Sequence, residues 1–221
     1  MGGDLYFEPG GNTSYESNIK RSRFIANVVP CRDEITAKER LKEFCALYKQ
    51  ANHNCWAYIL GTQQLAEHSS DAGEPAGTAG RPILGEIKRS GLINALVVVT
   101  RYFGGIKLGT RGLIEAYSMT AAQALALCPR AERMRMRALK VCFPYNSIGS
   151  VTHLLEAAGN EGELRWDFSS GLCETRSGEV SLSANFRLSA FPELIPKLDE
   201  LKDRKIITEY EIMETKEYFT I

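Results

Sequence analysis

The sequence contains few of the residue patterns that build metal centres and disulfide frameworks. It has only three histidines, and its cysteines form no CxxC pair, which excludes a zinc ribbon and a thioredoxin-like motif. Several cysteines lie within apolar runs, where a reduced thiol behaves as a small hydrophobic side chain. We therefore expect no metal and no cofactor. The six cysteines are Cys31, Cys45, Cys55, Cys128, Cys142 and Cys173.

Long hydrophobic segments are also absent. The longest apolar run, residues 95–99, is far shorter than the roughly 20 residues that cross a bilayer as a helix. Residues 1–18 have neither the basic start nor the apolar stretch of a signal peptide. We therefore expect a cytoplasmic protein without membrane contact.

The chain has no excess of either charge, with 27 Lys and Arg against 27 Asp and Glu. This balance argues against a general binder of polyanions, but the charges are unevenly placed. Residues 1–137 carry 18 basic and 13 acidic side chains, whereas residues 138–221 carry 9 and 14. Because local positive charge drives contact with phosphates, the first half is the better candidate for binding nucleic acid.

Length and composition predict two domains. A chain of 221 residues accommodates two domains of roughly 100 residues, and 44% hydrophobic residues are enough for a buried core in each. A charged segment at 130–137 marks the predicted boundary. The predicted parts are an N-terminal extension at 1–18, a first domain at 19–130 and a second domain at 138–216.

Hydrophobic periodicity predicts an α+β fold for both domains. In the first domain, strands are expected at 24–30, 55–60 and 93–103 and helices at 37–48, 82–91 and 113–127. Polar or Gly-rich loops are expected at 63–78 and 104–112. In the second domain, strands at 138–145, 163–168, 179–188 and 206–214 and helices at 148–158 and 191–201 give the order βαββαβ. That order is typical of a ferredoxin-like domain, a fold that hosts many functions.

Four stretches of the first half resemble the IMPACT family, in its bacterial YigZ-type branch. They are KRSRFI at 20–25, HNCWAY at 53–58, SDAGEPAGTAGRP at 70–82, and the segment 98–117 that contains TRYFGGIKLG. They occur in the family's order and at its spacing. Two positions depart from the family pattern, since Ala72 stands where Asp is usual and Arg111 where Gly is usual.

The resemblance implies a fold and a functional context. It implies a first domain of the ribosomal-protein second-domain-like type and a second domain similar to the last domains of elongation factor G. In eukaryotic members of the family, the implied role is regulation of translation through protein partners. For bacterial members, contact with RNA or the ribosome is an inference from the fold.

The two Gly-rich stretches hold most of the candidate binding residues. The loop at 104–112 lies between a strand and a helix N-terminus, a position that suits an anion, and Lys107 and Arg111 add positive charge. It is not a Walker A loop, because Thr110 and Arg111 stand where Lys and Ser or Thr are needed. The alternative is that its glycines only provide tight turns and close packing.

The stretch at 70–82 places two carboxylates three residues apart, at Asp71 and Glu74. Such a pair can hold a metal or act as acid and base, or it can bind loop N–H groups and cap a helix. His53 is expected to be packed or hydrogen-bonded. Arg101, at a strand end, is a candidate contact, whereas alternation places at least one of Tyr102 and Phe103 in the core.

Three functions remain open from these residues. The first is a binding module whose two Gly-rich loops form one groove for RNA, the ribosome or a translation-related protein. The second is a hydrolase that uses Asp71 and Glu74 with His53, and the third is a scaffold that acts through protein surfaces alone. No residue is assigned a catalytic role. The candidate binding residues are Arg23, His53, Asp71, Glu74, Arg81, Arg101, Lys107 and Arg111.

Overall fold

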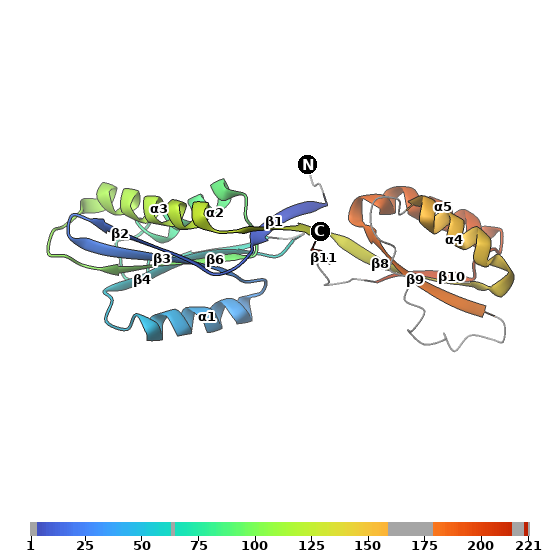
Figure 1. Ribbon diagram of the computed structural model, residues 1–221, viewed down its shortest axis with the longest axis horizontal. Helices are drawn as coiled ribbons and strands as arrows, with labels where there is room; N and C mark the ends of the chain where they lie inside the picture. The colour runs from blue at the N-terminus through green and yellow to red at the C-terminus, as the bar shows by residue number, and fades with distance from the viewer. Residues whose placement is uncertain (1–3, 63–64, 159–178, 214–218, 221) are drawn as a thin grey trace. The chain divides into compact units, whose positions relative to one another are not determined.

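The chain folds into two compact units, each with helices and an antiparallel sheet (Figure 1). The computed structural model describes residues 4–62, 65–158, 179–213 and 219–220. The N-terminal unit is Tyr6–Glu132, and the C-terminal unit combines Arg133–Ile221 with Met1–Leu5. The α+β class predicted from the sequence is confirmed. Within the described residues, no helix is long and apolar enough to cross a membrane.

A five-stranded antiparallel sheet forms the centre of the N-terminal unit, in the order β2-β3-β6-β4-β5. Helices α2 and α3 cover one face of this sheet and α1 covers the other (Figure 1). The strands are β2 (Thr13–Ile19), β3 (Ser22–Pro30), β4 (His53–Leu60), β5 (Ala66–Ser70) and β6 (Ala95–Tyr102). The helices are α1 (Glu34–Leu47), α2 (Gly80–Ser90) and α3 (Gly109–Leu127).

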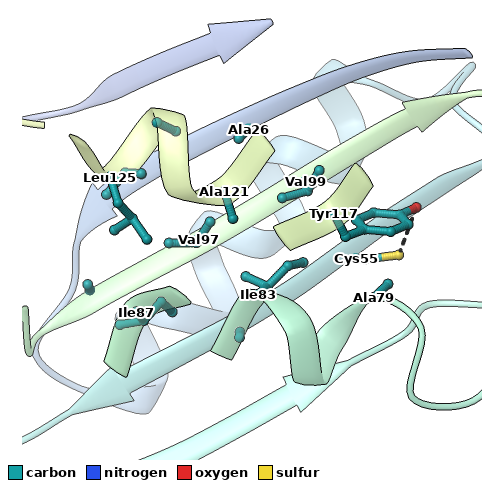
Figure 2. Packing of buried hydrophobic residues seen from close by; sticks show 14 of the residues in the cluster. Ala26, Cys55, Ala79, Ile83, Ile87, Val97, Val99, Tyr117, Ala121 and Leu125 are labelled. Carbon is teal, nitrogen blue, oxygen red and sulfur yellow. Dashed lines mark hydrogen bonds between the residues drawn. The ribbon is translucent and has the colours of Figure 1, made fainter. Parts of the chain in front are cut away.

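Strand β6 lies at the middle of the sheet and is buried on both faces. Val97 and Val99 pack with Ile83 of α2 and Tyr117 of α3 in the main core (Figure 2). Residues Leu96 and Val98 point to the other face and pack in the cluster that contains Ala37 of α1. Burial on two sides explains why this strand is a continuous apolar run instead of an alternating pattern.

Strands β2 and β5 were not predicted from the sequence. Both are edge strands, and β2 alternates half-buried and exposed residues while β5 is mostly exposed. Polar edge strands carry little of the hydrophobic signal on which prediction depends. Consequently β2, except for Ile19, lies in the segment predicted as an N-terminal extension, and β5 lies within the predicted loop at 63–78.

The C-terminal unit contains a three-stranded antiparallel sheet with the order β10-β8-β9. Its core includes Leu139 and Val141 from the sheet with Leu155 of α4 and Leu198 of α5. Helix α4 has the predicted bounds, whereas the strand predicted at 163–168 lies outside the described residues. The elements are β8 (Met136–Pro144), α4 (Ile148–Ala158), β9 (Glu179–Arg187), α5 (Phe191–Asp203) and β10 (Glu209–Met213).

A third small sheet uses the ends of the chain and the predicted boundary segment. Its order is β1-β7-β11, with β1 at Leu5–Pro9, β7 at Arg130–Met134 and β11 at Phe219–Thr220. The charged segment at 130–137 therefore consists of β7 and the start of β8.

Candidate functional site

Residues from all four family-like stretches meet at one end of the N-terminal sheet. Arg101, near the end of β6, is paired across the sheet with His53 at the start of β4 and with Phe24 of β3. The turn between β2 and β3 and the loop between β6 and α3 are at the same end. We call this region the hairpin end; it comprises residues 20–24, 52–53, 71–74 and 101–111.

The β2–β3 turn and the β6–α3 loop are in direct backbone contact at the hairpin end. The N–H of Gly104 donates to Oγ of Ser22 at 3.3 Å. A Cβ at Gly104 would lie 1.9 Å from the carbonyl oxygen of Arg21, so only glycine fits this position. The turn residues Lys20 and Arg21 both have positive φ, 44° and 67°, as in the type I′ turns of two-residue hairpins. The cations of the turn therefore lie beside the Gly-rich loop.

Beneath this contact, Glu74 and Arg101 form a buried ion pair. Nη1 of Arg101 donates to Oε1 of Glu74 at 2.7 Å, and the two side chains, Arg101 and Glu74, are only 7% and 3% exposed, respectively. The hydroxyl of Tyr117 donates to the same carboxylate oxygen at 2.8 Å. Because a buried charge is costly unless it is paired and hydrogen-bonded, these contacts give Glu74 a structural role.

The Arg101 guanidinium is enclosed by aromatic rings as well as by the carboxylate. Its central carbon lies 5.5 Å from the ring centroids of both Phe24 and Phe103. Nη2 lies 3.4 Å from Oγ of Ser22, and Nε is buried without a hydrogen-bond partner among the described residues. The sequence had suggested Arg101 as a contact residue at the end of a strand. The structure instead places its side chain beneath the surface.

Cys55 lies next to the ion pair and is fully buried. Its sulfur is 3.4 Å from the Tyr117 hydroxyl (Figure 2) and 2.9 Å from the carbonyl oxygen of Asp71. Burial raises the pKa of Cys55 to about 12, and burial also raises the pKa of Tyr117. A thiol that stays protonated at neutral pH is a poor nucleophile. His53 is hydrogen-bonded as predicted, with Nδ1 3.0 Å from the carbonyl oxygen of Ala72.

Asp71 caps helix α2 through its carboxylate. It accepts hydrogen bonds from the backbone N–H groups of Gly77, Ala79 and Gly80, at 2.8, 2.9 and 2.9 Å. Although partial burial acts in the opposite direction, these donors and the charge of Arg81 lower the pKa of Asp71. The carboxylate therefore fills the anion position at the start of α2, and it is held there as the ionised form.

Helix α3 has no such carboxylate at its start among the described residues and, as at α2, the side chain of its own N-cap residue does not cap it. That residue, Leu108, makes no side-chain hydrogen bond to the helix, and the first turn has no acidic residue. The first four N–H groups of a helix have no partner within the helix, and such groups bind anions. The exposed Lys107 precedes this helix end, and Arg111 lies in its first turn with a side chain that is 92% exposed.

The remaining predicted residues are exposed and partly paired. Arg23 forms a two-point ion pair with Glu16, at 2.8 and 2.7 Å, and lies over the Tyr102 ring. Arg111 pairs with Glu115 at 2.9 Å, one turn along α3. Arg81 is exposed near the start of α2. The structure therefore brings Arg23, His53, Asp71, Glu74 and Arg101 to neighbouring positions. Arg81 lies beside Asp71 at the start of α2, and Lys107 and Arg111 lie at the start of α3.

Several residues of the hairpin end give no clear signal in the sequence. Lys20 and Arg21 lie within a family-like stretch, but only the backbone contact with Gly104 connects them to the loop at 104–112. Asn52, whose Oδ1 accepts from the N–H of Phe103 at 2.7 Å, lies in no recognisable motif. Tyr102 is half-buried and Phe103 is exposed, so neither is in the core, contrary to the prediction for one of them.

Comparison with known proteins gives one consistent result. The Impact N-terminal domain family model matches residues 20–125. The chain is 37% identical to the IMPACT family member YvyE of Bacillus subtilis (strain 168) over 150 residues, which cover 68% of this chain and 69% of the relative. It is 40% identical over 147 residues to an IMPACT family member in the pol 5' region of Thermus thermophilus, covering 66% and 78% of the two chains.

One further relative and one solved structure are also similar to this chain. The IMPACT family member YigZ of Escherichia coli (strain K12) is 40% identical over 121 residues, covering 53% of this chain and 58% of the relative. A crystal structure described as that of a hypothetical protein superposes with a TM-score of 0.61 at 27% identity, covering 97% of this chain and 98% of the other. The chain belongs to the IMPACT family.

Proposed function

We propose that this protein is a translation-associated binding protein whose N-terminal unit contacts RNA through the hairpin end. One observation carries the proposal. The close approach of Gly104 to Arg21 places the β2–β3 turn, which carries Lys20 and Arg21, beside the loop that carries Lys107 and leads to the start of α3. Three exposed cations and a set of backbone donors therefore occur in one region.

This arrangement suits a phosphate backbone. Helix N-termini bind phosphate through their free N–H groups and their positive dipole end. Lys and Arg side chains strengthen such binding by releasing the counterions of the nucleic acid. The two helices differ at their starts, since α2 already has the carboxylate of Asp71 at this position, whereas no carboxylate from the described residues bonds the start of α3.

The translation context rests on the family and on the proposed folds. We propose that the domains span 19–130 and 138–216, that the first has the ribosomal-protein second-domain-like fold, and that the second is ferredoxin-like and similar to the last domains of elongation factor G. The family match at 20–125 and the division between Glu132 and Arg133 support the boundary near residue 130, whereas the N-terminal unit already starts at Tyr6 and includes β2. The order β10-β8-β9 supports a ferredoxin-like sheet, and the further strand predicted at 163–168 falls on residues outside the described ones.

The contacts of the hairpin end do not favour the alternative of a hydrolase. The Asp71 carboxylate accepts three backbone hydrogen bonds, and the Glu74 carboxylate is buried against Arg101 and Tyr117. A general base needs a free lone pair within reach of the substrate. His53, the third member of the hypothetical site, forms its hydrogen bond with a backbone carbonyl instead of with a carboxylate.

The test is RNA binding by the full chain as a function of salt. Labelled RNA oligonucleotides are titrated with the wild type and with Lys20→Ala/Arg21→Ala/Lys107→Ala, which leaves the buried Arg101 intact. We expect weaker binding and a shallower salt dependence, because the log–log slope of a single strand falls by about 0.7 for each phosphate that the protein ceases to neutralise. Lys38→Ala/Arg40→Ala on α1, away from the hairpin end, is the control.

Two outcomes would count against this function. If the triple variant binds RNA like the wild type at every salt concentration, the hairpin end is not the contact surface. If the wild type binds no RNA and does not sediment with ribosomes, while its protein partners survive high salt, the scaffold function replaces it, because polyelectrolyte contacts weaken with salt.

A further inference from the structure

Phe103 is an exposed aromatic ring on a rigid support. It is the first residue after β6, its side chain is 45% exposed, and its N–H is held by Oδ1 of Asn52. One face of its ring lies over the Arg101 guanidinium, 5.5 Å away. That guanidinium is itself fixed by Glu74 and by the Phe24 ring. The exposed ring is therefore held in place before any ligand binds.

The surroundings of this ring combine apolar and cationic groups. Ile106, 40% exposed, follows it in the loop, and the cations Lys20, Arg21 and Lys107 are exposed in the two segments that meet at Gly104. An exposed aromatic ring beside backbone-binding cations is the combination that binds single-stranded nucleic acid. A protein partner would use the apolar groups but would leave the cluster of cations unexplained.

We propose that Phe103 is a stacking platform for one unpaired nucleobase, so that the protein selects single-stranded over double-stranded RNA. This inference rests on the proposed RNA contact and specifies its ligand. A base in a single strand can leave its neighbours and stack on an aromatic side chain, whereas bases within a duplex are already stacked. The cations contact phosphates in either form, and the ring adds affinity only for the single strand. A pre-positioned ring also lowers the entropy cost of binding.

The experiment compares three labelled probes by fluorescence anisotropy with the full chain. The probes are a single-stranded RNA of about 12 nucleotides, within the site sizes of known single-strand binders, the same strand in a duplex, and an abasic strand of equal length. The wild type is expected to bind the single strand most tightly. Phe103→Ala is expected to weaken that binding about 5- to 100-fold, in line with alanine substitutions at other stacking sites, and to leave duplex and abasic binding unchanged. Phe103→Trp is expected to retain tight binding.

Two variants separate stacking from a general apolar contact. Ile106→Ala removes a neighbouring exposed side chain that cannot stack, and it should change single-strand binding far less than Phe103→Ala. Phe103→Trp adds an indole to the two tryptophans of the chain, and its fluorescence should be quenched by the single strand but not by the abasic strand. Melting curves check that the variants remain folded.

The results distinguish this inference from the function on which it rests. Equal affinity for single strand and duplex, or equal weakening by Ile106→Ala and Phe103→Ala, would overturn the stacking platform while RNA contact through the cations stood. Absence of RNA binding by the wild type would overturn both. If a purified protein partner no longer binds Phe103→Ala while RNA binding is unaffected, the ring belongs to a protein interface and the platform is wrong.

Discussion

At the scale of single residues, the hairpin end depends on a charge pair that is closed to solvent. Glu74 and Arg101 come from a loop and a strand end that are 27 positions apart. Their pairing holds the loop at 71–74 against β6, and it also places the guanidinium beneath Phe103. A residue that contributes to a binding surface can therefore act from below it, by fixing the side chain that is exposed.

Glu74→Gln is expected to lower the free energy of unfolding by about 3 kcal/mol or more, because it leaves the Arg101 charge buried without its partner. The control is Glu115→Gln, which breaks the exposed pair with Arg111 and should cost less than about 1 kcal/mol. Urea unfolding followed by circular dichroism measures both. Similar small changes for the two variants would mean that water reaches the Glu74 site.

At the scale of elements, the two helices on the same sheet face differ at their N-termini. Helix α2 is capped by Asp71 from the preceding loop, whereas α3, which begins at Gly109, receives no such carboxylate from the described residues and no side-chain cap from Leu108. A cap stabilises its helix, and an uncapped end leaves donors for a ligand. The same element type thus serves stability in one case and, in our proposal, binding in the other.

Asp71→Asn is expected to lower the free energy of unfolding by about 1–2 kcal/mol at neutral pH, as the removal of a strong helix cap does. The folded state lowers the pKa of Asp71, so its ionised form stabilises the fold above the unfolded pKa of about 3.9, and this contribution is lost as the pH falls through the lower folded pKa. Thermal melting from neutral to strongly acidic pH should show a smaller acid destabilisation for Asp71→Asn than for the wild type. The exposed Asp203→Asn is the control, and it should follow the wild type.

Sequence patterns predicted the buried elements much better than the edges. Strand β6 and helix α3 were evident because their apolar residues form a run or a helical stripe. Strands β2 and β5 were missed because edge strands expose polar residues on one or both faces. The candidate residues were found mainly through the family resemblance, and their partners, such as Tyr117 and Ser22, emerged only from the fold.

At the scale of the whole molecule, the two units have separate hydrophobic cores and the two halves of the chain have opposite net charges. Each unit has its own hydrophobic core, and the positive excess lies in the first half of the chain. Because the proposed contact residues all belong to the N-terminal unit, the C-terminal unit is not needed for the contact itself.

A fragment of residues 6–132 is therefore expected to fold cooperatively and to bind single-stranded RNA within about threefold of the full chain, a difference of less than about 1 kcal/mol. Circular dichroism melting tests the folding, and anisotropy titration at matched salt tests the binding. A folded fragment that bound RNA far more weakly, by about tenfold or more, would show that the contact surface extends into the C-terminal unit.

The sequence by itself determined the family, the α+β class, and the position of the strongly apolar strands and helices, because these depend on local patterns of hydrophobicity and on recognisable motifs. Tertiary structure decided which candidate residues are accessible. Arg101 and Glu74 are charged and lie in loop-like or strand-end contexts, yet they are buried because the fold brings them to each other. Phe103 is apolar, yet it is exposed because the strand ends there and the space beneath is filled by Arg101. Burial is a property of contacts between distant segments, and local sequence patterns do not reveal those contacts.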